Sequence, residues 1–110
     1  MNLPDDIFND FPNNNLDEAG CIFISEALET NNSLTTLNLK DNHVQSIGSI
    51  YLAATLEQYN HIQYLNLTGN QINDKGLEAL ASVMHNLKAL NLTNNQISSN
   101  SASFLAETLK

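Results

Sequence analysis

The side chains that could act as nucleophiles, bases or metal ligands are few and scattered. The three histidines share no spacing typical of metal ligands, and the single cysteine lies in an acidic segment. A reactive thiolate needs a neighbouring base or cation to lower its pKa, and no Lys, Arg or His precedes residue 30. We therefore interpret Cys21 as a buried structural thiol, and His43, His61 and His85 as solvated surface residues.

Motifs that assemble a catalytic or cofactor site are also missing from the sequence. It contains no Cys-x-x-Cys pair, no His-Glu-x-x-His motif, no glycine-rich phosphate loop and no Gly-x-Ser-x-Gly motif. The adjacent acids Asp5-Asp6 and Asp17-Glu18 are typical of a solvated face rather than of an acid–base pair. The sequence thus predicts a protein that is not an enzyme and that holds no metal or cofactor.

The charge balance narrows the classes of partner. Twelve acidic residues against four lysines give a net charge of -8. Nucleic acids and anionic membranes attract clustered Lys and Arg, so both are disfavoured as partners. The sequence starts without the basic and apolar stretches of a secretory signal, and no apolar run approaches the roughly 20 residues that span a bilayer. These features predict a cytoplasmic protein with a free thiol.

The dominant pattern is an eleven-residue motif that occurs three times. It reads L-x-x-L-N-L-x-x-N-x-V at 34–44, I-x-x-L-N-L-x-x-N-x-I at 62–72 and L-x-x-L-N-L-x-x-N-x-I at 87–97. Its leucines alternate with polar residues, which is the period of a short strand. Apolar residues then recur at four-residue steps, which indicates a helix. Each unit is therefore predicted to be a strand, a turn and a helix.

The pattern divides the chain into a repeat domain and a short leading segment. Residues 14–110 form the domain, with a partial repeat at 14–33 and repeats at 34–61, 62–86 and 87–110. Residues 1–13 are expected to be either a cap over the first hydrophobic layer or a flexible tail. The helices are expected across Gly20, Ile24 and Leu28, across Gly48, Leu52 and Leu56, across Gly76, Leu80 and Met84, and across Ser101, Leu105 and Leu109.

These motifs resemble the leucine-rich repeat family, in particular its long, helix-containing class typified by ribonuclease inhibitor. The distances between the motifs lie within the roughly 20–29 residues of such repeats. The resemblance implies an α/β solenoid, a curved right-handed βα superhelix with a short parallel sheet on its inner face and helices outside.

Two sets of residues are expected to serve the scaffold. A buried turn leaves backbone groups that need partners, and an Asn amide offers two donors and an acceptor. The resemblance implies that Asn42, Asn70 and Asn95 form such an asparagine ladder. The glycines at 20, 48 and 76 are expected to let the helices approach the strand layer closely.

The residues free to recognise a partner lie between and beside the strand leucines. Strand alternation points them away from the core, onto the concave face where leucine-rich repeat proteins commonly bind partners. Tyr64 is the one aromatic among them and the best anchor candidate. The alternative is that the asparagines of this set form only a solvated polar column. The set is Thr36, Asn38, Lys40, Tyr64, Asn66, Thr68, Ala89, Asn91 and Thr93.

Three functions fit these features. The first is a non-catalytic protein–protein interaction module that binds a protein partner on the concave face. The second is an assembly module, in which the uncapped repeat ending at Lys110 and its open strand edge form a homo-oligomer. The third is a bacterial effector translocated into a host cell to act on host proteins, suggested by the asparagine-rich, arginine-free composition.

Overall fold

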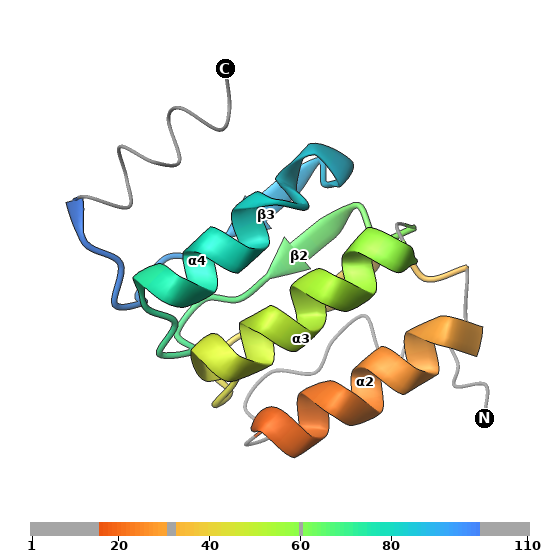
Figure 1. The fold of residues 1–110 in the computed structure, drawn as a ribbon, viewed down its shortest axis with the longest axis horizontal. Coiled ribbons are helices and arrows are strands. Elements are labelled where there is room, and N and C mark those ends of the chain that lie inside the picture. The colour runs from red at the N-terminus through yellow and green to blue at the C-terminus, as the bar shows by residue number, and fades with distance from the viewer. Residues whose placement is uncertain (1–15, 31–32, 60, 100–110) are drawn as a thin grey trace.

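The computed structural model describes residues 16–30, 33–59 and 61–99, and it arranges them in two layers (Figure 1). One layer contains three α-helices that lie side by side, and the other contains a three-stranded sheet. The helices are α2 (Glu18–Thr30), α3 (Gln45–Gln58) and α4 (Asp74–Ala81). The strands are β1 (Thr36–Asn38), β2 (Tyr64–Asn66) and β3 (Ala89–Asn91), and the 3-10 helix η1 (Met84–Asn86) precedes β3.

The sheet is parallel, with the strand order β1-β2-β3. Its register pairs identical positions of successive repeats, so that Leu37, Leu65 and Leu90 stand in one row. Helix α3 connects β1 to β2, and α4 connects β2 to β3. Parallel strands need such crossovers, because a tight hairpin can join only antiparallel strands. The predicted α/β solenoid with a short parallel sheet is confirmed.

The core lies between the two layers and is built from columns of equivalent residues. Leu39 and Leu67 from the strand side are fully buried, as are Ile24, Leu52 and Leu80 from the three helices. Burying one such side chain stabilises the fold by about 1.5–3 kcal/mol. No single strand–helix unit has a second apolar face to cover its own, so each depends on the units stacked beside it.

The helix of the second repeat, α4, is shorter than predicted, because Met84 does not belong to it. Helix α4 ends at Ala81, and the N–H of Ser82 donates to the carbonyl oxygens of Ala79 and Leu80. Met84 instead begins η1, which carries the chain into Leu87. The second repeat is shorter than the first, and a tight 3-10 turn makes the return to the sheet in the room that is left. The helix expected across Ser101, Leu105 and Leu109 and the expected cap or tail at 1–13 lie outside the described residues.

The expectation that the glycines let the helices approach the strand layer closely is wrong. A Cβ on Gly48 would lie 2.8 Å from Val44 Cγ1, one turn earlier, and 3.0 Å from Cys21 Sγ on helix α2. A Cβ on Gly76 would lie 2.6 Å from Ile72 Cγ2 and 3.0 Å from the Oγ of Ser46 on α3. Gly48 and Gly76 therefore allow close approach between neighbouring helices, since these pack side by side in one layer.

Candidate functional site

The buried turn after each strand is held by an asparagine side chain. Asn70 is fully buried, and its Nδ2 donates to the carbonyl oxygens of Leu39, at 2.8 Å, and Thr68, at 3.1 Å. Its Oδ1 accepts from the N–H of Val44 at 3.2 Å. One side chain therefore supplies partners to backbone groups of both its own repeat and the preceding one, which a buried turn requires.

The same arrangement recurs on either side of Asn70. Asn42 Oδ1 accepts from the N–H of Leu16 at 2.9 Å. Asn95 Oδ1 accepts from the N–H of Ile72 at 2.9 Å, and Asn95 Nδ2 donates to the carbonyl oxygen of Leu67 at 2.9 Å. The three asparagines form a ladder across the described repeats, with their polar atoms engaged by the scaffold.

A residue in the left-handed backbone region precedes each ladder asparagine, and its type is a further sequence signal of the turn. Asp41, Gly69 and Asn94 have φ angles of 55°, 68° and 56°. Gly, Asn and Asp are the residues that adopt this backbone region most readily. These three types at one repeat position therefore indicate a sharp turn into the ladder.

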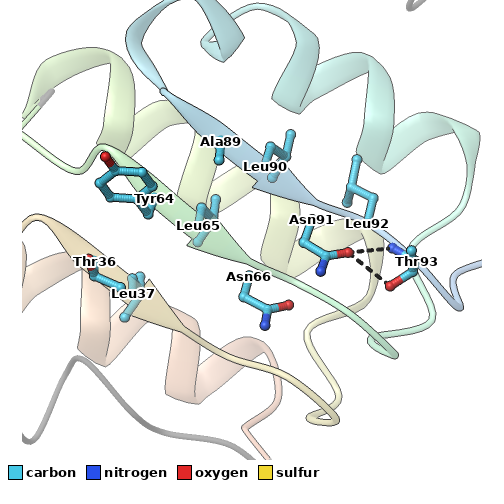
Figure 2. Close-up of a pocket in the computed structure, with 10 residues that line it drawn as sticks. All are labelled: Thr36, Leu37, Tyr64, Leu65, Asn66, Ala89, Leu90, Asn91, Leu92 and Thr93. Carbon is cyan, nitrogen blue, oxygen red and sulfur yellow. Dashed lines mark hydrogen bonds between the residues drawn. The ribbon is translucent and has the colours of Figure 1, made fainter.

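The face of the sheet turned away from the helices, called the concave face below, carries a hollow of about 510 Å³ (Figure 2). Tyr64 comes from the middle strand and keeps 43% of its surface exposed. The sheet register places Thr36 on one side of it and Ala89 on the other. The hollow is lined by Thr36, Leu37, Tyr64, Leu65, Asn66, Ala89, Leu90, Asn91, Leu92 and Thr93.

The asparagine that ends each strand has a local structural role that the sequence reasoning missed. Asn66 Oδ1 accepts from the N–H of Thr68 at 3.0 Å, and Asn91 Oδ1 accepts from the N–H of Thr93 at 3.1 Å. Asn38 makes the equivalent bond to the N–H of Lys40, also at 3.1 Å. An Asn that bonds the backbone two residues on is a recognised turn device. The candidate contact asparagines therefore also shape the strand ends.

Thr68 does not lie open on the concave face as expected. It is only 7% exposed, and its Oγ1 lies 3.2 Å from Thr93 Oγ1. The strand has already ended at Asn66, and the chain there turns inward toward the buried Asn70. Strand alternation therefore no longer decides where the side chain points. Of the three residues expected beyond the strands, Lys40 and Thr93 are exposed.

The cysteine lies on α2, and its Sγ atom faces Gly48 of α3. Cys21 is fully buried. Burial, together with the negative charges of Asp17 and Glu18, raises the pKa of its thiol to about 12. A thiol with such a pKa stays protonated at neutral pH and is a poor nucleophile.

The interpretation of all three histidines as solvated surface residues is wrong for His61. His43 and His85 are exposed, but His61 is half-buried. Its Nε2 atom is shielded from solvent and has no hydrogen-bond partner in the described part of the chain. His61 directly precedes Ile62, which is 1% exposed, so the chain carries it to the edge of the core.

Residues 16–30, 33–59 and 61–99 contain neither a metal-binding cluster nor a membrane-spanning helix. No cluster of three or more His, Cys, Asp or Glu side chains in these segments could hold a metal ion. Helices there are also too short, or too polar, to cross a bilayer. The candidate site among these residues is therefore the concave hollow around Tyr64.

Stacked strand–helix units, a parallel sheet and an asparagine ladder define a solenoid of the leucine-rich type. The family model described as "Leucine Rich repeat" matches residues 30–53, 60–81 and 83–106, which together exceed half of the chain. The chain belongs to the leucine-rich repeat family. A comparison with curated proteins gives no match. Repeats of this kind commonly mediate protein–protein interaction through their extended concave surfaces.

Proposed function

We propose that this chain is a non-catalytic protein-binding module that receives its partner on the concave face. The observation that carries the proposal is the half-exposed Tyr64 in the hollow of about 510 Å³. Tyrosine is enriched among the residues that dominate binding energy, because its ring buries much area at low entropic cost. A concave surface with few convergent polar groups is also the usual form of a binding site.

The neighbours of Tyr64 suggest what the partner presents. Ala89 is exposed and small, so a partner side chain has room to lie against the tyrosine ring. The amides of Asn66 and Asn91, at the other end of the strands, offer polar contacts (Figure 2). The partner segment would therefore place an apolar side chain beside Tyr64 and a hydrogen-bonding group near the asparagines.

Affinity capture with matched tyrosine variants tests this proposal. The chain is immobilised, and proteins captured from a lysate are quantified by mass spectrometry for the unmodified protein, for Tyr64→Ala and for Tyr51→Ala. Tyr51 is the matched control, because it is 42% exposed and lies on α3, in the helix layer. Loss of a hot-spot side chain costs at least about 2 kcal/mol, or roughly thirtyfold in Kd. We expect at least one captured partner to be lost with Tyr64→Ala and kept with Tyr51→Ala.

A second variant tests the concave face even if Tyr64 contributes little to the binding energy. Ala89→Arg fills the space beside Tyr64 without touching the core, because Ala89 is exposed. Survival of every captured partner in both Tyr64→Ala and Ala89→Arg would contradict binding at the concave face.

A second candidate function, self-assembly, is favoured by the third strand. Leu87, Leu90 and Leu92 are only partly buried, and within the described residues β3 pairs with a strand on one side alone. An open strand edge with half-covered leucines can be completed by another copy of the chain. Light scattering at micromolar concentration should then report a dimer or larger species. A monomer at all concentrations would rule this function out.

We also infer that the chain belongs to the long, helix-containing class of the family, typified by ribonuclease inhibitor. Support comes from α3, a 14-residue helix that fills the connection between the first two strands. Solving an experimental structure that includes residues 100–110 would test whether the third repeat carries a helix of the same kind.

A further inference from the structure

Helix α3 exposes a stripe of apolar side chains on its outer face. Ile47, Ile50 and Tyr51 are 53%, 50% and 42% exposed. Residues three and four apart lie on the same face of a helix, so these three side chains form one surface. The opposite face of α3 carries its buried residues, among them Leu52 and Leu56. The stripe is therefore additional to the side that packs into the core.

The repeat framework does not require apolar residues at these positions. The equivalent residues of α4, one repeat later, are Lys75, Glu78 and Ala79. Helix α4 thus shows the polar outer face expected of a surface helix. The equivalent of Tyr51 in α2 is Phe23, which is 45% exposed. Apolar exposure therefore extends over two neighbouring helices and stops at the third. The helix-face patch consists of Phe23, Ile47, Ile50 and Tyr51.

The charge around this patch is strongly negative. Helices α2, α3 and α4 together carry six carboxylates and one lysine, a net charge of -5. Exposed carboxylates flank the patch on its own two helices, with Glu26 and Glu29 on α2 and Glu57 on α3. The one lysine, Lys75, lies beside an acid, with its Nζ atom 4.0 Å from Oε2 of Glu78. The patch is thus an apolar surface bordered by acids.

We propose that the helix-face patch binds a cationic amphipathic helix of a protein partner. Apolar side chains on one face of that helix would cover Ile47, Ile50 and Tyr51, as in other complexes where a helix lies in an apolar groove. Its lysines and arginines would face Glu26 and Glu29. Complementary charge of this kind steers association and selects against other partners.

The same charge argues against two other occupants. A second copy of the chain carries the same net charge of -8 and would bring like charges together across the patch. An anionic lipid surface would be repelled for the same reason. The surface is also separate from the concave face, so this proposal and the proposed function can fail independently of each other.

Fluorescence anisotropy with a synthetic probe tests the proposal on the full chain. The probe is a labelled Leu/Lys peptide of about 18 residues, or five helical turns, with all leucines on one face. We expect Ile47→Ser/Ile50→Ser to weaken binding by about tenfold or more, whereas Tyr64→Ala, on the concave face, leaves the Kd unchanged. Both isoleucines are about half exposed, so circular dichroism should show that the variant remains folded. Unchanged binding in the isoleucine variant would overturn the proposal.

Control probes separate the apolar and the charged contributions. A scrambled peptide of the same composition has no apolar face, and a Leu/Glu peptide reverses the charge, so both should bind at least about tenfold more weakly. The protein variant Glu26→Gln/Glu29→Gln should weaken binding and reduce its salt dependence, since screening acts on exposed charges. Equal binding of either control peptide would overturn the proposal. So would a homodimer, or binding to anionic vesicles, that is lost in the isoleucine variant.

Discussion

The second and third repeats carry the same strand motif, yet their cores differ. Leu65 and Leu67 in the second repeat are 2% and 0% exposed, whereas Leu90 and Leu92 in the third are only partly buried. Strand β2 has a neighbour on both sides, and β3 pairs on one side within the described residues. A matching motif therefore does not guarantee a matching contribution to stability, because burial comes from the units stacked on either side.

The largest expected difference between these repeats comes from their central leucines. Leu65→Ala should lower the free energy of unfolding by about 2–5 kcal/mol, since it empties a fully packed site. Leu90→Ala should cost about half as much, because less of its side chain leaves water on folding. Urea unfolding followed by circular dichroism measures both. Equal losses in the two variants would show that the third repeat is as well packed as the second.

The ladder asparagines give the next largest expected difference. Asn70→Ala leaves the N–H of Val44 without its partner, whereas the carbonyl oxygen of Leu39 keeps the Nδ2 of Asn42 as a donor. A buried group left unpaired costs about 1–3 kcal/mol, so we expect a loss of stability in that range. Asn95→Ala should cost less, because Asn95 is only half-buried and water can replace part of its bonds. Faster amide exchange at Val44 in the Asn70 variant would locate the defect, and an unchanged exchange rate would contradict it.

The helix layer offers a smaller and more local test. A Cβ on Gly76 would lie 3.2 Å from the backbone Cα of Ser46, whereas a Cβ on Gly48 would meet only side chains. Gly76→Ala should therefore cost about 1–2 kcal/mol as overpacking, and Gly48→Ala less. The higher helix propensity of alanine, about 0.5–1 kcal/mol, offsets part of each loss. Thermal unfolding should give the lower Tm for Gly76→Ala, and the reverse order would contradict helix-to-helix contact as the cause.

The smallest expected effect concerns the chemical modification of the Cys21 thiol, which should be slow in the native protein. Cys21 is fully buried, and its pKa is raised from 9.0 to about 12, foremost by burial. Iodoacetamide at pH 8 should leave the native protein unlabelled and should label it fully in denaturant. Labelling of the native protein within minutes would show that the surroundings of Cys21 are as accessible to solvent as the leucines of the third strand.

The raised pKa of Cys21 fixes the direction in which the stability of the fold changes with pH. The protonated thiol is favoured in the folded chain, so its contribution to stability is fully present below pH 9. That contribution is lost as the pH rises from 9 towards 12. Urea midpoints across this range should fall less in Cys21→Ala than in the unmodified protein. An identical decline in both proteins would exclude the thiol as the source.

The sequence predicts the layers of this fold well, because its two periods change at a fixed point in every repeat. Alternating leucines locate β1, β2 and β3, and four-residue steps locate the helices. The end of α4 escapes prediction, since Met84 keeps the helical spacing although α4 ends at Ala81. Repeat length, rather than apolar spacing, decides where that helix stops.

The candidate site is less predictable, because residue type does not reveal competing local bonds. Thr68 matches the contact pattern but points inward, since the strand ends two residues before it. Asn66 and Asn91 match it too, yet each also accepts a hydrogen bond from the backbone two residues on. The apolar outer face of α3 has a signal in the sequence, the spacing of Ile47, Ile50 and Tyr51, but only the structure shows that this side is uncovered.

The asparagine ladder has a consequence for how such a chain can change length. Asn70 bonds Val44, and Asn42 makes the same bond to Leu16. Removing residues 34–61 as a block would bring Asn70 to the place of Asn42, with Leu16 as its new partner. Recombination that adds or deletes whole repeats therefore keeps every turn supplied with a donor and an acceptor. A deletion of any other length would leave the ladder out of phase.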